Sequence, residues 1–131
     1  MSSRINIFLL ADSRLFREAL SRILRSKTDL DVVGCEPCSA EAVARIDSSA
    51  CDVVLIDSGS REPFDVALLR RVSLAARTAR TILINMVEDE AIFLRAVRER
   101  VAGYLLQHAS AMDVVAAVRA VHQGEAVCPP R

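Results

Sequence analysis

Five short apolar segments alternate along the chain with longer segments whose apolar residues recur at helical spacing. The apolar segments are rich in β-branched residues and nearly continuous, which is typical of strands buried on both faces of a sheet. Five strands that alternate with helices through short connections predict a parallel sheet with right-handed crossovers and helices on both faces. The expected strands lie at residues 5–10, 31–34, 53–56, 81–86 and 102–106.

Signals at the ends of the helical segments support this pattern. Ser39 stands directly before the second helical segment, and the four residues from Ser110 to Asp113 predict a capping box at the start of the last one. Gly124 follows the last helical turn, where a left-handed residue is favoured. No linker divides the chain, so we expect one domain over residues 1–126, with residues 127–131 as a tail or the start of a linker.

Composition narrows the choice of function. The 131 residues, 52% of them hydrophobic, are enough to bury one core. The 17 basic and 17 acidic residues give a formal net charge of zero, whereas domains that bind nucleic acid through its phosphates carry a basic excess. No apolar run is long enough to cross a bilayer and no signal-peptide pattern is present, so we expect a cytoplasmic domain that contacts neither DNA nor membrane directly.

Two of the four cysteines, Cys35 and Cys38, form a C-x-x-C motif. In a cytoplasmic protein these thiols are expected to be reduced, and a redox role needs a lowered thiol pKa. The chain has no Trp, and nothing else in it matches a thioredoxin active site. An incidental pair at a strand end is therefore the favoured interpretation, with thiol redox sensing as an open alternative.

Polar residues stand where the expected strands end. Asp12 follows the first strand, Asp57 ends the third and Asn85 lies near the end of the fourth. Ligand sites in open parallel sheets form at the carboxyl ends of strands, so Asp12 and Asp57 converge on one pocket if the first and third strands are neighbours. Paired carboxylates suit Mg²⁺, and a carboxylate beside Mg²⁺ can attack phosphorus to give an aspartyl phosphate.

The same strand ends have simpler interpretations. Asp12 can simply cap the first helix while Asp57 begins a loop, because Asp is common at such junctions. A dinucleotide-binding turn is excluded, because the first glycine of the chain is Gly34, far beyond the turn after the first strand. The lack of glycine-rich, metal-histidine and catalytic-triad motifs argues against a conventional enzyme.

A specific combination of motifs covers nearly the whole chain. The most specific are the strand that ends in Asp57 and the Gly-Tyr-Leu-Leu stretch that begins at Gly103. The pattern resembles the receiver domains of two-component response regulators, most closely the NarL/FixJ type. The resemblance implies a flavodoxin-like (βα)5 fold, α/β and doubly wound, with a five-stranded parallel sheet in the order 2-1-3-4-5. The stretches that carry it are 7–12, 30–34, 52–57, 102–106, 109–110 and 120–127.

The resemblance also implies roles and partners. Asp57 would be the phosphoacceptor for a histidine kinase, and Asp12, Asp57 and the carbonyl of Gly59 would hold Mg²⁺. The expected partners are that kinase and a second copy of the chain in a homodimer. DNA would be reached only through a helix-turn-helix output domain that these residues do not contain. The implied switch positions are Asn85, Tyr104 and Gln107.

Three positions depart from the family pattern. Ala11 replaces the first of two adjacent acids, Asn85 replaces a Ser or Thr, and Gln107 replaces a lysine. The two remaining carboxylates are compatible with a weaker Mg²⁺ site. The lost ammonium removes a charge-assisted contact to phosphoryl oxygens that typically contributes about 1.5–3 kcal/mol.

Two arginines follow the acids in sequence. Our hypothesis is that Arg14 or Arg61 enters the pocket, pairs with Asp57 and replaces the metal or the lysine. The alternative is that both are solvated surface arginines, because most surface ion pairs contribute little to stability.

Three functional interpretations follow from these residues. The first is a phosphorylation switch, in which Asp57 accepts the phosphoryl group and a partner surface responds to control transcription. The second is a degenerate receiver that keeps the fold as a phosphorylation-independent binding or dimerisation module. The third, from another class, is a thiol redox sensor that uses Cys35 and Cys38.

Overall fold

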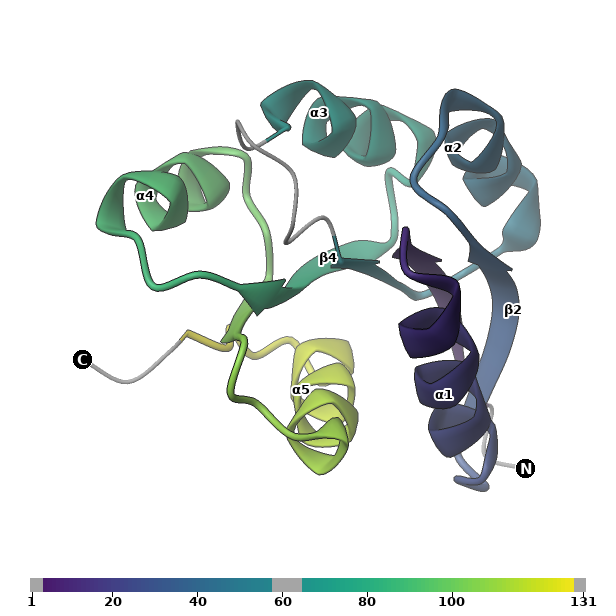
Figure 1. Ribbon diagram of the computed structural model, residues 1–131. Helices are drawn as coiled ribbons and strands as arrows, with labels where there is room; N and C mark the ends of the chain where they lie inside the picture. The colour runs from purple at the N-terminus through teal and green to yellow at the C-terminus, as the bar shows by residue number, and fades with distance from the viewer. Residues whose placement is uncertain (1–3, 58–64, 129–131) are drawn as a thin grey trace.

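The computed structural model describes residues 4–57 and 65–128. Its centre is a five-stranded parallel sheet in the order β2-β1-β3-β4-β5, as the family resemblance implied (Figure 1). Each strand is present where the apolar segments predicted one, with ends that differ by at most two residues. The strands are β1 (Ile5–Ala11), β2 (Leu30–Glu36), β3 (Val53–Asp57), β4 (Arg80–Met86) and β5 (Gly103–Leu106).

Helices cover both faces of this sheet (Figure 1). α1 (Arg14–Arg25) and α5 (Ala111–His122) lie on one face. The other face carries α2 (Ala40–Ile46), the short 3-10 helix η1 (Asp47–Ser49), α3 (Val66–Ala75) and α4 (Glu90–Arg98). Within the described residues, no helix is both long and apolar enough to span a membrane.

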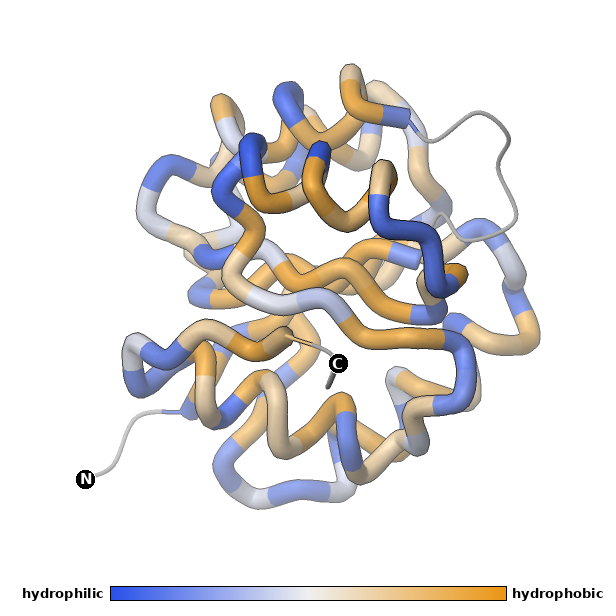
Figure 2. Tube along the Cα trace, turned by 90° about the vertical axis from the view of Figure 1, so that its left-hand side faces the viewer, coloured by the Kyte–Doolittle hydropathy of each residue, from blue (hydrophilic) through white to orange (hydrophobic). Residues whose placement is uncertain are grey.

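The continuous apolar character of the strands follows from this layering. In β1, Ile7 and Leu9 pack into the cluster beneath α1 and α5, whereas Phe8 and Leu10 pack into the cluster beneath α2, α3 and α4. Successive side chains of a strand point to opposite faces, so a strand covered on both sides needs apolar residues at every position. The strands accordingly form an apolar band through the middle of the molecule (Figure 2).

Local signals in the sequence also match the structure. Ser39 caps α2 by accepting a hydrogen bond from the backbone N–H of Ala42, and Ser110 forms the predicted capping box with Asp113. Gly124 has φ of 93° directly after α5, so the predicted left-handed residue is confirmed.

A close approach explains one glycine of β2. A Cβ atom at Gly34 would lie 2.3 Å from the ring of Phe8, on the neighbouring strand. The register between β1 and β2 shifts beside this position, between Ile7 and Phe8. Only glycine leaves room for the Phe8 ring at this point of the sheet.

The chain stays attached to the sheet just past the end of α5. The backbone of Val127 accepts a hydrogen bond from Tyr104 N–H and donates one to the carbonyl of Ala102, beside β5. Pairing thus extends one residue beyond residue 126, where the sequence predicted the domain to end. The boundary itself stays a prediction.

Candidate functional site

The carboxyl edge of the sheet brings the two predicted acids together. β1 and β3 are parallel neighbours, and their register sets Ala11 opposite Asp57, so Asp12 follows at the same edge. The Asp57 side chain ends a fully buried strand, and the residue is only 7% exposed. The two acids therefore lie at the same edge of the sheet, as the strand order predicted.

Asp12 does not act as the cap of α1, which was the simpler interpretation of this residue. Ser13 is the N-cap, and its hydroxyl accepts a hydrogen bond from the backbone N–H of Phe16. One carboxylate oxygen of Asp12, Oδ1, accepts a hydrogen bond of 2.9 Å from the backbone N–H of Cys38, in the connection between β2 and α2. Asp12 thus ties that connection to the end of β1.

Cys38 touches both acidic strand ends. Besides its N–H contact with Asp12, its thiol lies 3.7 Å from the backbone carbonyl oxygen of Asp57. Cys35 contacts a different carbonyl, that of Arg17, at 3.9 Å. Neither cysteine forms a disulfide with another described residue, and the pair lies at the end of β2, where the sequence predicted it.

Asn85 approaches Asp57 from β4 in an unusual backbone conformation. Its amide nitrogen, Nδ2, lies 3.4 Å from each carboxylate oxygen of Asp57, and its φ is 59°. Left-handed residues other than glycine are uncommon, although Asn adopts this conformation more readily than most. The register between β4 and β5 shifts at the same place, between Leu83 and Met86.

The hypothesis of a pocket arginine is wrong for Arg14. Its guanidinium pairs with Glu18 at 2.7 Å, and its side chain is 83% exposed. Among the described residues, Arg17 is a cation that contacts the backbone of the site, and the sequence reasoning missed it: its Nη1 donates a hydrogen bond of 2.6 Å to the carbonyl of Ala11. Arg61, like the metal-ligand position Gly59, lies outside the described residues.

Tyr104 and Gln107 differ in their surroundings. Tyr104 is buried, its hydroxyl donates to the carbonyl of Val87 at 3.2 Å, and its ring meets Phe93 edge to face at 5.1 Å. Burial raises the pKa of the Tyr104 phenol above its ordinary value, and the charge of Asp89 adds to the rise. Gln107 is exposed and lines a cavity of about 140 Å³ that Asn85 also lines.

The described residues are compatible with a magnesium ion but do not form a complete cage. Two carboxylates at one edge match the way Mg²⁺ binds, through one or two acids with several waters retained. A carboxylate offers about four lone-pair sites, so the N–H of Cys38 leaves Asp12 with capacity to bind a metal. No group of three His, Cys, Asp or Glu side chains suited to a metal is found in residues 4–57 and 65–128.

Comparison with known proteins gives the class to which this fold and site belong. No family model matches the chain. The receiver domain of the putative response regulator NarL from Mycobacterium tuberculosis superposes with a TM-score of 0.82 and 26% identity, over 94% of this chain and 99% of that one. A LuxR-family response regulator from Aurantimonas superposes with a TM-score of 0.83 at 23% identity, over 98% of this chain and 91% of that one. The fold is that of a receiver domain.

Sequence relatives of the chain are bacterial regulatory proteins. The transcriptional regulatory protein LnrK of Bacillus subtilis is 29% identical over 126 residues, which are 96% of this chain and 57% of LnrK. The response regulator UvrY of Escherichia coli is 28% identical over 121 residues, which are 92% of this chain and 56% of UvrY. In sequence and fold the chain is similar to the receiver domains of NarL/LuxR-type response regulators, and it spans little more than half the length of these relatives.

Proposed function

We propose that this domain accepts a phosphoryl group on Asp57 from a phosphohistidine of a histidine kinase and passes the change to a partner surface. The observation that carries the proposal is the register of β1 and β3, which sets a nearly buried carboxylate beside a second acid at the edge of the sheet. Such edges are where doubly wound domains place their ligands.

In phosphoryl transfer the protein contributes mainly by positioning the reacting groups and by stabilising the charge on the phosphoryl oxygens. A carboxylate oxygen of Asp57 attacks phosphorus, the O–P bond forms as the P–N bond breaks, and the imidazole nitrogen keeps the electron pair and takes a proton from solvent. Mg²⁺ held by Asp12 and Asp57 would neutralise charge on the phosphoryl oxygens. The amide of Asn85, already directed at Asp57, donates a hydrogen bond to one of those oxygens.

Position 107 does not supply the cation that the family pattern has there. Gln107 is neutral where the family pattern has a lysine, and Ala11 stands where a further acid is usual. The Arg17 guanidinium is directed to the Ala11 carbonyl and so supports the backbone of the pocket. We expect slow phosphorylation and a weakly held metal compared with a receiver that has all of these groups.

The response would travel from Asp57 through Asn85 to the segment before α4. Tyr104 joins β5 to this segment through its hydrogen bond to Val87, and its contact with Phe93 reaches α4. A phosphoryl group that pulls Asn85 towards Asp57 shifts the population of conformations on the face formed by α4, β5 and α5.

Partners follow from the same proposal. Leu15 is 82% exposed and lies three residues after Asp12 in sequence, so an apolar contact for the kinase lies next to the sheet edge that carries Asp12 and Asp57, here called the acidic edge. A second copy of the chain is the expected partner of the responding face. Control of transcription, which the name of LnrK states for that protein, would act in the cytoplasm through an output domain outside these residues.

Intact-mass spectrometry after incubation with Mg²⁺ and acetyl phosphate tests the proposal. The expected result is a gain of one phosphoryl group by the native chain and by Glu125→Gln, an exposed control, but not by Asp57→Asn. Uptake that persists in Asp57→Asn would move the acceptor to another residue. No uptake by the native chain would instead favour the phosphorylation-independent binding module.

A further inference from the structure

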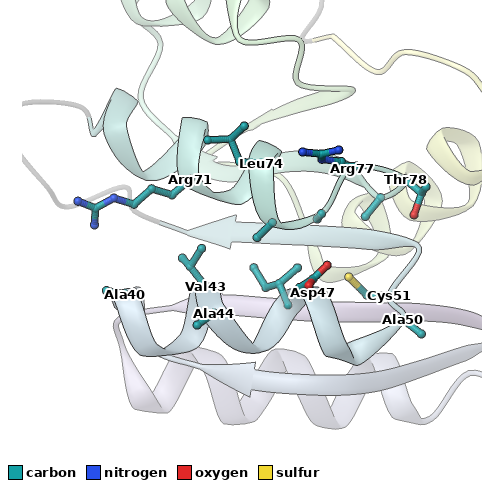
Figure 3. Close-up of a pocket in the computed structure, with 14 residues that line it drawn as sticks. Ala40, Val43, Ala44, Asp47, Ala50, Cys51, Arg71, Leu74, Arg77 and Thr78 are labelled. Atoms are coloured by element: carbon teal, nitrogen blue, oxygen red, sulfur yellow. The ribbon is translucent and has the colours of Figure 1, made fainter.

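A groove lies between α2 and α3, away from the acidic edge (Figure 3). Its volume is about 920 Å³. Six of the fourteen lining residues are alanines, so small side chains on both walls leave the space between the helices open. Leu74, on the α3 wall, is 71% exposed although it is apolar.

The arginines of α2, of α3 and of the connection after α3 fall into two groups. Arg45 of α2 pairs with Glu36, and Arg70 of α3 pairs with Glu99 at 2.9 Å; neither lines the groove. Arg71 and Arg77, which do line it, form no ion pair with any described residue. The two lie towards opposite ends of the α3 wall (Figure 3).

Charge in the groove is therefore unbalanced although the whole chain is neutral. Arg71 and Arg77 contribute two positive charges, and Asp47 on the α2 side contributes one negative charge, which leaves an excess of one positive charge. The groove is apolar in the middle and has Arg71 and Arg77 towards its two ends. This arrangement fits a ligand with apolar side chains in the middle and carboxylates at both ends. Grooves between helices commonly receive one face of an amphipathic helix in this way.

We infer that the α2–α3 groove docks an acidic amphipathic helix from a partner protein. The apolar face of that helix covers Leu74 and the alanine walls, and its flanking carboxylates pair with Arg71 and Arg77. This surface is separate from the face formed by α4, β5 and α5, and its occupation does not require phosphorylation of Asp57.

The test uses two synthetic helical peptides of about fifteen residues, enough for a marginally stable helix. Both carry leucines at positions i, i+3, i+4 and i+7; one is flanked by glutamates and the other by lysines. Binding is measured by fluorescence anisotropy, and the contact surface is mapped by amide chemical shifts in NMR. The variants are Arg71→Glu/Arg77→Glu and, as a matched control on α1, Arg22→Glu/Arg25→Glu.

The acidic peptide is expected to bind the native chain and the α1 control alike, to shift amides of α2 and α3, and to bind the groove variant at least tenfold more weakly. The basic peptide should show the reverse preference for the groove variant. Ala44→Trp, at an exposed helical position that fills the groove, should abolish binding while circular dichroism shows an intact fold.

Three results would overturn the inference: no binding of the acidic peptide, equal binding to both charge variants, or shifts confined to other elements. A second copy of the chain is the competing occupant. Sedimentation that shows a dimer disrupted by Leu74→Ser, an exposed position, would assign the groove to self-association instead.

Discussion

The acidic edge has two halves, one formed by β1 and β3 and the other by β4 and β5, and they differ in the regularity of their strand pairing. On the β1–β3 side the ladder runs without interruption from Ile7 and Val53 to Ala11 and Asp57. On the β4–β5 side the register shifts before Met86, and Asn85 sits in a left-handed conformation. The regular half holds the carboxylates, and the irregular half holds the groups that would sense what binds to them.

The substitutions fall unevenly on these halves. The regular half keeps Asp12 and Asp57 and loses one acid at Ala11, so the groups that we propose as metal ligand and nucleophile remain. The irregular half loses both the hydroxyl and the ammonium that the family pattern has, at Asn85 and Gln107. We conclude that capacity for phosphorylation should survive better in this chain than its efficiency or its response.

The largest change should come from restoring a cation to the irregular half. Gln107→Lys adds a charge-assisted contact of about 1.5–3 kcal/mol, which corresponds to a phosphorylation rate about tenfold to a hundredfold higher. The rate is followed by intact mass with acetyl phosphate and Mg²⁺. His108→Lys adds the same charge at the next exposed position and should leave the rate unchanged; equal gains in both variants would contradict the role of position 107.

A somewhat smaller effect is expected in the regular half. Asp12→Ala removes one proposed metal ligand and the acceptor for the Cys38 N–H, so Mg²⁺ affinity should fall about tenfold and the free energy of unfolding by about 1–3 kcal/mol. Isothermal titration calorimetry and urea denaturation measure the two quantities. Asp12→Asn keeps the hydrogen-bond acceptor and should recover most of the stability without the metal affinity. Unchanged Mg²⁺ binding in both variants would remove Asp12 from the metal site.

The backbone of Asn85 should make a stability difference of about 1–2 kcal/mol. An alanine at φ of 59° meets the left-handed steric cost that glycine avoids, so Asn85→Ala should unfold at lower urea concentration than Asn85→Gly. Both variants lose the amide contact with Asp57, which makes them a matched pair. Coincident unfolding curves would show that the left-handed conformation is absent in solution.

The smallest effect is a spectroscopic one at Tyr104, which is the single tyrosine of a chain without tryptophan. Because burial, helped by Asp89, raises the pKa of this phenol, its phenolate absorbance should appear at higher pH than that of free tyrosine. The raised pKa favours the protonated folded state, so this stabilisation is complete below the ordinary phenol pKa and is lost as the pH rises through the folded value. Asp89→Asn keeps a helix cap and should move the transition part of the way back; a native midpoint at or below that of free tyrosine would place the ring in water.

The fold could be predicted because its signals are local. Strands covered on both faces must be apolar at every position, and Ser39 and Ser110 act on backbone groups within the next helical turn. The meeting of Asp12 and Asp57 could be predicted as well, because it needs only the strand order and the rule that parallel strands end at one edge.

The finer contacts of the site depend on distances between distant segments. Nothing near Cys38 in sequence indicates that its N–H reaches Asp12, and the register shift beside Asn85 is a property of the pairing of β4 with β5, two segments apart in the sequence. Arg17 had a signal that was not used. It lies three and seven residues before the buried Leu20 and Leu24, so helical spacing turns it towards the sheet, whereas Arg14 points outwards to Glu18.

The proposal depends on whether the two carboxylates of the regular half act together on a phosphoryl group. Fluorine NMR of the chain with beryllofluoride and Mg²⁺ tests this most directly, because the ligand mimics the product and does not depend on the rate of transfer. We predict a bound fluorine resonance that requires Mg²⁺ and is absent from Asp57→Asn. A native chain that shows no bound resonance at saturating Mg²⁺ would contradict the account.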